Sequence, residues 1–341
     1  MTTMLKLVGA YGSPYSCKMR AVLRYRRIPF RWIVRGSGED VGIPEVPVAI
    51  IPVLVFPGES GMPDTAMVDS SPQIRRLEEL YTDRRVIPPD RGLAFLDLLI
   101  EDYADEWMTK QMFHYRWSYP ADIAKAGKLL PLDRQPQISY ERLEKISQFI
   151  SNRQINRLGV VGSNPITKSV IEDSYRRILG ILDRHIEGRM FMMGARPASS
   201  DFAIFGQLSQ LIGFDPTPSA IAIEIAPRVV SWVNRMEDLS GLDVTDSEWM
   251  TRDGVELLRP VLEEIGRVYV PFLRANAAAL ESGAKQVECE IDGRPWVQEP
   301  FPYQGKCLRW LREAHVRLDS SDRTWVDSVL AGTGCERMFA A

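Results

Sequence analysis

The chain has 341 residues, of which 45% are hydrophobic and 26% are charged. This length is sufficient for two domains with cores of their own, and the composition is that of an ordinary globular protein. Lysine and arginine number 42, aspartate and glutamate number 45, and the formal net charge is −3. This balance argues against a dedicated nucleic-acid-binding protein.

The four cysteines are widely spaced without a C-x-x-C motif, and the N-terminus lacks the charged and apolar regions of a secretion signal. We therefore expect a reducing, cytoplasmic compartment. The cysteines and histidines also lack the spacing of a zinc site, so no metal is expected. The most apolar segment, Val46 to Phe56, contains two prolines and is much shorter than the roughly 20 residues that span a membrane. No membrane association is expected.

The chain begins with an apolar run from Leu5 to Tyr11, which is followed by Gly12-Ser13-Pro14 and by a helical pattern through Tyr25. This order predicts a strand, a tight turn and a helix. Ser13 can cap the helix with its side-chain oxygen, and Pro14 fits the first turn because no hydrogen bond is lost there. A helix start presents unpaired N–H groups and the positive end of the helix dipole. The pattern therefore predicts an anion site at Ser13.

Short strands and one further helix follow the first helix. Residues 30–34 are rich in β-branched and aromatic side chains, whereas residues 36–47 are rich in glycine and proline and predict a loop. A hairpin is predicted over 53–56 and 66–68, and a helix over about 72–81. Together these elements predict an α/β domain over residues 1–82.

The pattern becomes helical after a charged segment with a double proline, residues 83–92, which we interpret as an interdomain linker. From Leu93 to about Trp117, apolar residues recur at three- and four-residue spacing and predict one long amphipathic helix. The other positions of this helix hold five acidic residues: Asp97, Glu101, Asp102, Asp105 and Glu106.

The remaining sequence predicts an all-helical domain over 93–245 and a C-terminal extension over 246–341. The helical domain contains an insertion at about 118–165, with a helix over 140–158, and then helices over 167–187, from about 199, and over 226–236. In the extension, we expect a long helix over 253–280 that Pro260 and Pro271 kink or split. A hairpin around Asp292-Gly293 and short helices over 306–318 and 324–330 follow.

Three motifs in this order resemble the glutathione transferase superfamily. They are Ser13-Pro14-Tyr15-x-x-Lys18 between a strand and a helix, Ile51-Pro52 before a strand, and Asp69-Ser70 before a helix. The resemblance covers roughly residues 4 to 245 and implies a thioredoxin-like N-terminal domain followed by an all-α domain. It also implies a homodimer in which the N-terminal domain of one copy contacts the first long helix of the other.

The same resemblance implies roles for five residues, with glutathione as the co-substrate. Ser13 matches the hydroxyl that donates to the glutathione sulfur. Ile51 matches the residue whose backbone pairs with the cysteinyl part of glutathione, with Pro52 in cis holding the geometry. Asp69 and Ser70 match the pair that binds the γ-glutamyl end. Purely structural readings stay open, namely a helix cap at Ser13, a trans proline at a strand start, and an N-cap without a ligand at Asp69-Ser70.

Other residues compete for the role of thiol activator. Tyr11 or Tyr15 can supply a phenol in place of the Ser13 hydroxyl. Cys17, one helical turn after Ser13, would imply a thiol-disulfide reductase, but its position favours a small packed side chain.

The density of aromatic residues in 107–119 suggests a wall for an apolar electrophile, with Phe113 and Trp117 as the candidates. Some of these aromatic residues must belong to the core. His114 is expected to be a satisfied or exposed histidine and not a catalytic base.

We therefore expect an enzyme that activates the glutathione thiol for attack on a small hydrophobic electrophile. Conjugation, isomerisation, dehalogenation and ether cleavage share this first step, and the sequence does not separate them. The alternative is a non-catalytic protein of the same fold that uses its insertion and extension to bind a ligand or partner.

Overall fold

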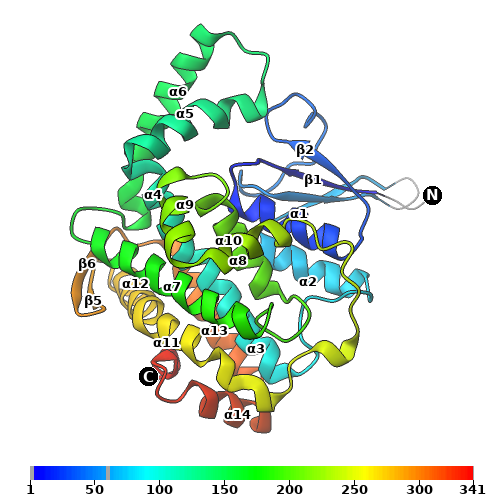
Figure 1. Ribbon diagram of the computed structural model, residues 1–341, viewed down its shortest axis with the longest axis vertical. Coiled ribbons are helices and arrows are strands. Elements are labelled where there is room, and N and C mark those ends of the chain that lie inside the picture. The colour runs from blue at the N-terminus through cyan, green and yellow to red at the C-terminus, as the bar shows by residue number, and fades with distance from the viewer. Residues whose placement is uncertain (1–3, 59–61, 341) are drawn as a thin grey trace.

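The computed structural model describes residues 4–58 and 62–340 (Figure 1). Its N-terminal part is a four-stranded mixed sheet in the order β2-β1-β3-β4 with two helices. β1 is parallel to β2 and antiparallel to β3, and β3 and β4 form the predicted hairpin. The elements are β1 (Leu5–Gly9), α1 (Pro14–Tyr25), β2 (Phe30–Val34), β3 (Val53–Phe56), β4 (Thr65–Val68) and α2 (Ser70–Leu80).

Alternation along the strands gives this sheet two apolar faces. Leu5 and Leu7 of β1 join the main core, whereas Val8 belongs to a small cluster on the opposite face. The predicted loop over 36–47 contains neither helix nor strand, and its Ile43 and Val46 pack against the small cluster. The sheet is therefore covered on one face by helices and on the other by this loop.

The predicted long helix runs without a break from Arg91 to Ser118. It consists of α3 (Arg91–Tyr103), a π-helical segment (Ala104–Met108) and α4 (Thr109–Ser118). The expectation of one amphipathic helix is wrong in one respect, because its acidic side does not face water. Four of its five acidic residues are buried and Asp102 is half-buried.

The insertion forms a helical hairpin that projects from the body of the molecule (Figure 1). Its helices are α5 (Pro120–Arg134) and α6 (Tyr140–Ile155), followed by a short 3₁₀ turn (Leu158–Val161). The second helix was predicted and the first was not, since Pro120 and Pro131 read as breakers in the sequence. Pro120 instead occupies the first turn of α5, where proline is tolerated.

Four helices complete the helical domain, and three of them were predicted. They are α7 (Lys168–Gly188), α8 (Ser199–Leu211), α9 (Pro216–Ile225) and α10 (Pro227–Met236). α9 was missed because two prolines in its first turn resemble a loop. At the start of the buried α8, Asp201 accepts hydrogen bonds from the backbone N–H groups of Ala198 and Met192, at 2.9 Å each. Asp201 thus satisfies backbone N–H groups at this helix start.

The C-terminal extension matches its predicted pattern of split helix, hairpin and short helices. Both residues of the Asp292-Gly293 turn have positive φ, as a tight hairpin requires. The elements are a 3₁₀ turn (Asp246–Glu248), a 3₁₀ segment (Arg252–Leu258), α11 (Arg259–Glu264), a π segment (Ile265–Tyr269), α12 (Val270–Ser282), β5 (Val287–Ile291), β6 (Arg294–Gln298), α13 (Pro302–Val316), α14 (Ser320–Leu330) and a 3₁₀ turn (Cys335–Met338).

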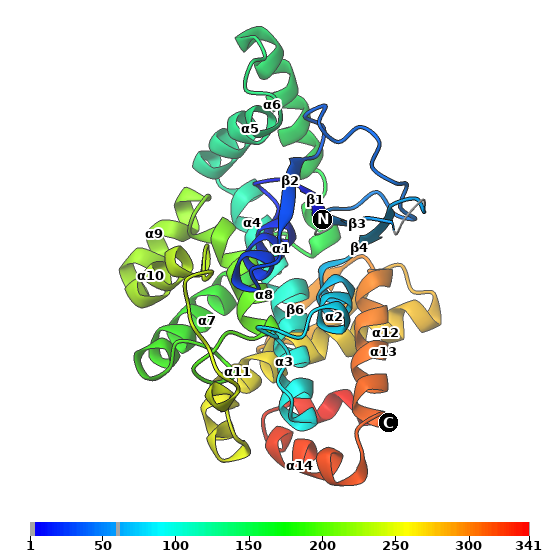
Figure 2. The same ribbon diagram turned by 90° about the vertical axis from the view of Figure 1, so that its right-hand side faces the viewer.

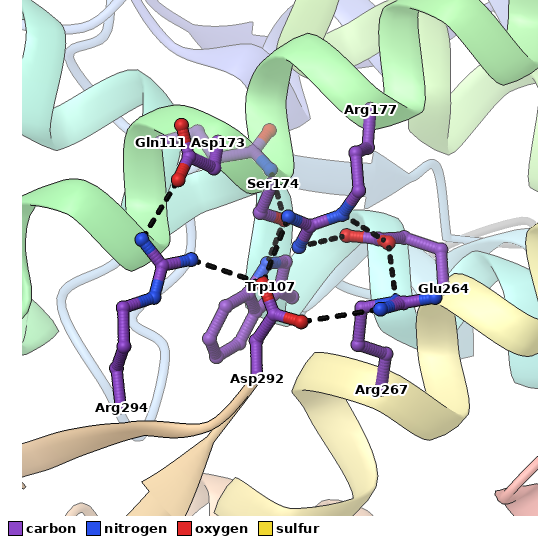
Figure 3. A network of polar contacts seen from close by, with 9 residues as sticks. All are labelled: Trp107, Gln111, Asp173, Ser174, Arg177, Glu264, Arg267, Asp292 and Arg294. Carbon is purple, nitrogen blue, oxygen red and sulfur yellow. Dashed lines mark hydrogen bonds and ion pairs between the residues drawn. The ribbon is translucent and has the colours of Figure 1, made fainter.

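A network of ion pairs fixes the hairpin of the extension to the helical domain (Figure 3). The carboxylate of Asp292 accepts hydrogen bonds from Arg177 of α7 at 3.0 Å and from Arg267 at 3.2 Å. Arg177 also donates two hydrogen bonds to Glu264, at 2.8 and 3.0 Å. Arg294 reaches Asp173 of α7 at 2.7 Å. Because these groups come from α7, α11, the π segment and the hairpin, the extension is built into the helical body.

The extension also covers the first long helix (Figure 2). α13 and α14 pack against α3, and every residue of α3 after Arg91 is buried or half-buried. The predicted fold class, an α/β domain followed by an all-α domain with extra C-terminal helices and a small hairpin, is confirmed. The helix that the resemblance assigns to a dimer contact, however, is largely covered within the same chain. Of the described helices, none is long and apolar enough to cross a lipid bilayer.

Candidate functional site

The three sequence motifs meet at one edge of the sheet. The end of β1, the start of β3 and the end of β4 lie side by side, because Val8 pairs with Val53 and Val53 pairs with Val68. The motifs continue the chain directly from these three strand ends: Ser13 follows β1, Ile51-Pro52 precedes β3, and Asp69-Ser70 follows β4. Strand register therefore brings together residues that are up to 57 positions apart in the sequence.

Ser13 is the N-cap of α1, and Pro14 is the first residue of the helix. Its side-chain oxygen accepts a hydrogen bond from the backbone N–H of Ser16 at 3.3 Å. Ser13 is thus a helix cap, but the cap hydrogen bond uses the Ser13 hydroxyl only as an acceptor. In the part of the chain that the structure describes, no acceptor binds the Ser13 hydroxyl proton. This proton remains available to an anion at the helix start.

Side chains of the helical domain hold the turn before Ser13. Arg116 of α4 donates to the carbonyl of Gly12 at 2.9 Å, and Gln210 of α8 donates to the carbonyl of Tyr11 at 3.1 Å. Arg116 is buried and forms an ion pair with Asp215 at 2.9 Å. Burial raises the pKa of Asp215 to about 6, although the Arg116 charge acts in the opposite direction. The sequence motifs did not reveal Arg116 and Gln210, because their contacts with this turn span 104 and 199 positions.

The Ile51-Pro52 peptide bond is cis, as the resemblance implies. Gln73 of α2 donates to the carbonyls of Pro52 at 2.9 Å and Met67 at 2.7 Å, so α2 ties the start of β3 to the end of β4. Among residues 4–58 and 62–340, neither the N–H nor the C=O of Ile51 has a backbone partner. Ile51 therefore presents free backbone N–H and C=O groups beside the strand ends.

Asp69 and Ser70 lie at the start of α2. Asp69 is the N-cap residue and has a φ of 74°, a left-handed conformation that costs an aspartate of order 1–3 kcal/mol. Ser70 is the first helical residue and is buried. The first N–H groups of α2 have no partner within the helix, so this start presents free donors and the positive end of the helix dipole at the same edge.

Of the competing groups, the thiol of Cys17 and the phenol of Tyr15 are already engaged. Cys17 is buried, and its sulfur lies 3.4 Å from the side-chain nitrogen of Gln210. Burial raises the pKa of the Cys17 thiol, which opposes formation of a reactive thiolate. The Tyr15 hydroxyl donates to the backbone carbonyl of Asp105 at 2.8 Å. Tyr11 is exposed and packs edge-on against Trp32.

A buried ion network lies directly behind α1. Nζ of Lys18 contacts Glu101 at 2.7 Å and Asp105 at 2.6 Å, and the Ser71 hydroxyl donates to Glu101 at 2.6 Å. Burial by itself lowers the pKa of Lys18, but the two carboxylates outweigh this effect and raise it overall. This network joins the α/β domain to the long helix. Its signal in the sequence was the four-residue spacing of Asp97, Glu101 and Asp105, which marks one face of a helix.

The aromatic candidates on α4 are mostly core residues. Trp117 is only 2% exposed, whereas its neighbour Phe113 is half-buried. His114 contacts Ser163 at 2.7 Å and Glu172 at 3.1 Å and is thus a satisfied buried histidine. Within residues 4–58 and 62–340, no three His, Cys, Asp or Glu side chains come together as a metal site.

Comparison of sequences matches residues 7–85 to the family of glutathione S-transferase N-terminal domains. This match spans the sheet edge and all three motifs. Residues 7–85 are therefore similar to a glutathione S-transferase N-terminal domain. No curated protein matches the chain.

Several solved structures of glutathione transferases are similar to this chain at low identity. A family member from Pseudomonas fluorescens pf-5, with two glutathione molecules bound, is 17% identical, with a TM-score of 0.43 over 70% of this chain and 94% of that one. The Tau class enzyme of mango, Mangifera indica, is 16% identical, with a TM-score of 0.42 over 72% and 96%. Rice GST1 in complex with glutathione is 17% identical, with a TM-score of 0.42 over 72% and 93%.

Proposed function

We propose that this chain binds glutathione at the sheet edge formed by the three motifs and activates its thiol at Ser13 for attack on a hydrophobic electrophile. The observation that supports this most strongly is the convergence of three complementary groups on one edge. These are a hydroxyl with a free proton at one helix start, a free backbone segment, and a carboxylate beside a second helix start.

The cysteinyl and γ-glutamyl parts of glutathione each have a complementary group at this edge. The backbone of Ile51 pairs with the cysteinyl residue, and the start of α2 at Ser70 receives the γ-glutamyl carboxylate through its N–H and hydroxyl groups. The Asp69 carboxylate attracts the γ-glutamyl ammonium group. This placement brings the sulfur to Ser13, where a donated hydrogen bond and the helix dipole both favour the thiolate, which is the nucleophile.

A non-catalytic binding protein is the second candidate, and one observation favours it. The α5–α6 hairpin projects from the body and exposes large apolar side chains, with Tyr140 90% and Phe149 68% exposed. Such a surface suits contact with a partner. A panel of aryl halides, epoxides and aryl ethers separates the two candidates. Turnover of any of them with glutathione supports the enzyme, and glutathione binding without turnover across the panel supports the binding protein.

The double variant Asp69→Asn, Ser70→Ala tests the glutathione site. Asparagine is chosen because it tolerates the left-handed conformation at position 69. Loss of a hydrogen bond to a charged group costs about 1.5–3 kcal/mol, so affinity should fall by roughly 10- to 100-fold or more. Isothermal titration calorimetry with glutathione measures this. Glu79→Ala, at the exposed opposite end of α2, is the matched control and should bind normally. Wild-type affinity in the double variant would exclude the site.

We propose that a single chain is the functional unit, in place of the homodimer that the resemblance implies. α13 and α14 cover α3, which is the helix that the dimer contact requires. Light scattering at micromolar concentration is expected to give the mass of one chain, 38.7 kDa. A dimer mass would show that two copies associate through another surface.

A cytoplasmic location fits the same chemistry. All four cysteines are free thiols, and glutathione is a co-substrate of reducing compartments. We therefore propose that the protein works in the cytoplasm.

A further inference from the structure

A residue of the C-terminal extension reaches the proposed glutathione site. The hydroxyl of Tyr303, in the first turn of α13, donates a hydrogen bond to Oδ2 of Asp69 at 2.6 Å. The two residues are 234 positions apart in the sequence. This hydrogen bond joins the start of α13 to the start of α2, where Asp69 lies.

Several contacts fix Tyr303 in this position. Asn276 of α12 binds both the N–H and the carbonyl of Phe301, at 2.8 and 3.0 Å, and so anchors the start of α13. Gln304, next to Tyr303, donates to the backbone carbonyl of Glu106 at 3.0 Å. The Tyr303 ring packs edge-on against Trp310 with a centroid separation of 5.9 Å. The hydroxyl is therefore held in place by its surroundings and does not depend on Asp69 alone.

The bond controls the orientation of the Asp69 carboxylate. Asp69 makes no side-chain cap bond to its own helix. Across the described residues, Tyr303 supplies the one hydrogen bond to this carboxylate, and it uses Oδ2. Burial and the neighbouring Asp69 raise the pKa of Tyr303, so that its phenol stays protonated as a donor. Oδ1 is left unoccupied for a cation.

We propose that Tyr303 is a positioning residue of the γ-glutamyl subsite: by holding Oδ2 of Asp69, it turns Oδ1 toward the α-ammonium group of glutathione. The proposal rests on the proposed function of the sheet edge. It gives the C-terminal extension a role in ligand recognition. Through Tyr303, the extension favours peptides whose γ-glutamyl group carries a free amine.

Tyr303→Phe tests this, because it removes the hydroxyl and keeps the ring against Trp310. Isothermal titration should show that affinity for glutathione falls roughly 3- to 10-fold, the value of one ordinary hydrogen bond. N-glutaryl-cysteinylglycine lacks only the α-amino group and should bind wild type and Tyr303→Phe equally. In an Asp69→Asn background, Tyr303→Phe should cause no further loss of glutathione affinity.

Tyr269→Phe is the matched control. Tyr269 also belongs to the extension and also donates to a carboxylate at 2.6 Å, but to Asp102 and not to Asp69. It should leave glutathione affinity unchanged. Three results would overturn the proposal. They are equal losses of glutathione affinity in Tyr303→Phe and Tyr269→Phe, equal losses in Tyr303→Phe for glutathione and for N-glutaryl-cysteinylglycine, and unchanged glutathione affinity in Tyr303→Phe. If wild type binds neither ligand, the proposed function fails first, and that result is distinct from all of these.

Discussion

Replacing Ser13 by alanine is expected to lower the turnover of glutathione with an electrophile by roughly 10- to 100-fold, the value of a hydrogen bond to a charged sulfur. The reason is that the hydroxyl proton has no acceptor within the described protein and is positioned at a helix start. Glutathione affinity should change little, because Ile51, Asp69 and Ser70 remain. The pH at which bound glutathione ionises, below about 8.5 in wild type, should rise in the variant.

The controls for this variant separate chemistry from helix stability. Ser13→Ala also removes a helix cap, which costs about 1 kcal/mol of folding stability. Ser139→Ala removes an equivalent cap, since Ser139 accepts from the N–H of Arg142 at 3.3 Å in the projecting hairpin. It should leave turnover unchanged, as should Cys17→Ser. Thiolate absorbance of the complex against pH is the readout. An unshifted curve in Ser13→Ala, or lost turnover in Cys17→Ser alone, would show that Ser13 is the wrong residue.

Lys18→Met is expected to lower the free energy of unfolding by about 3–5 kcal/mol at pH 8. The side chain is fully buried and is the counter-ion of both Glu101 and Asp105. Methionine keeps most of the volume but leaves two buried carboxylates without a cation. Chemical denaturation followed by circular dichroism measures the loss. Lys145→Met is the matched control: this side chain is 75% exposed in its ion pair with Glu141, and its loss should cost at most about 1 kcal/mol.

The pH dependence of Lys18→Met gives a second test. Burial raises the pKa of Asp105 to about 6 even with Lys18 present, whereas Lys18 outweighs burial at Glu101 and lowers its pKa. Without Lys18, the folded-state pKa of Asp105 rises further above that of the unfolded chain, and burial raises the pKa of Glu101 as well. A raised acid pKa contributes stability that is lost as the pH rises through it. The variant should therefore be less destabilised at pH 5 than at pH 8. An equal loss at both pH values would contradict the assignment of the charges.

The local pattern was sufficient to predict the helix cap at Ser13. The cis bond before Pro52 and the helix start at Asp69-Ser70 were implied by the resemblance, and the structure contains both. The Asp292-Gly293 turn likewise fixed the hairpin of the extension, because that dipeptide favours the required positive φ angles.

What the sequence did not reveal depends on contacts between distant segments. The acidic residues of the long helix alternate with apolar ones as they would on a solvent-exposed helix, and only tertiary packing places Glu101 and Asp105 around Lys18. Arg116 and Tyr303 contact the site from 104 and 234 positions away, and no local pattern encodes such contacts. α9 was missed for a local reason, since two prolines in one helical turn read as a loop.

A crystal structure of the complex with glutathione tests the central claim most directly. The account predicts the sulfur within hydrogen-bonding distance of Oγ of Ser13, the cysteinyl backbone paired with Ile51, and the γ-glutamyl group between Asp69 and the start of α2. Glutathione bound elsewhere, or bound at this edge with its sulfur away from Ser13, would contradict it.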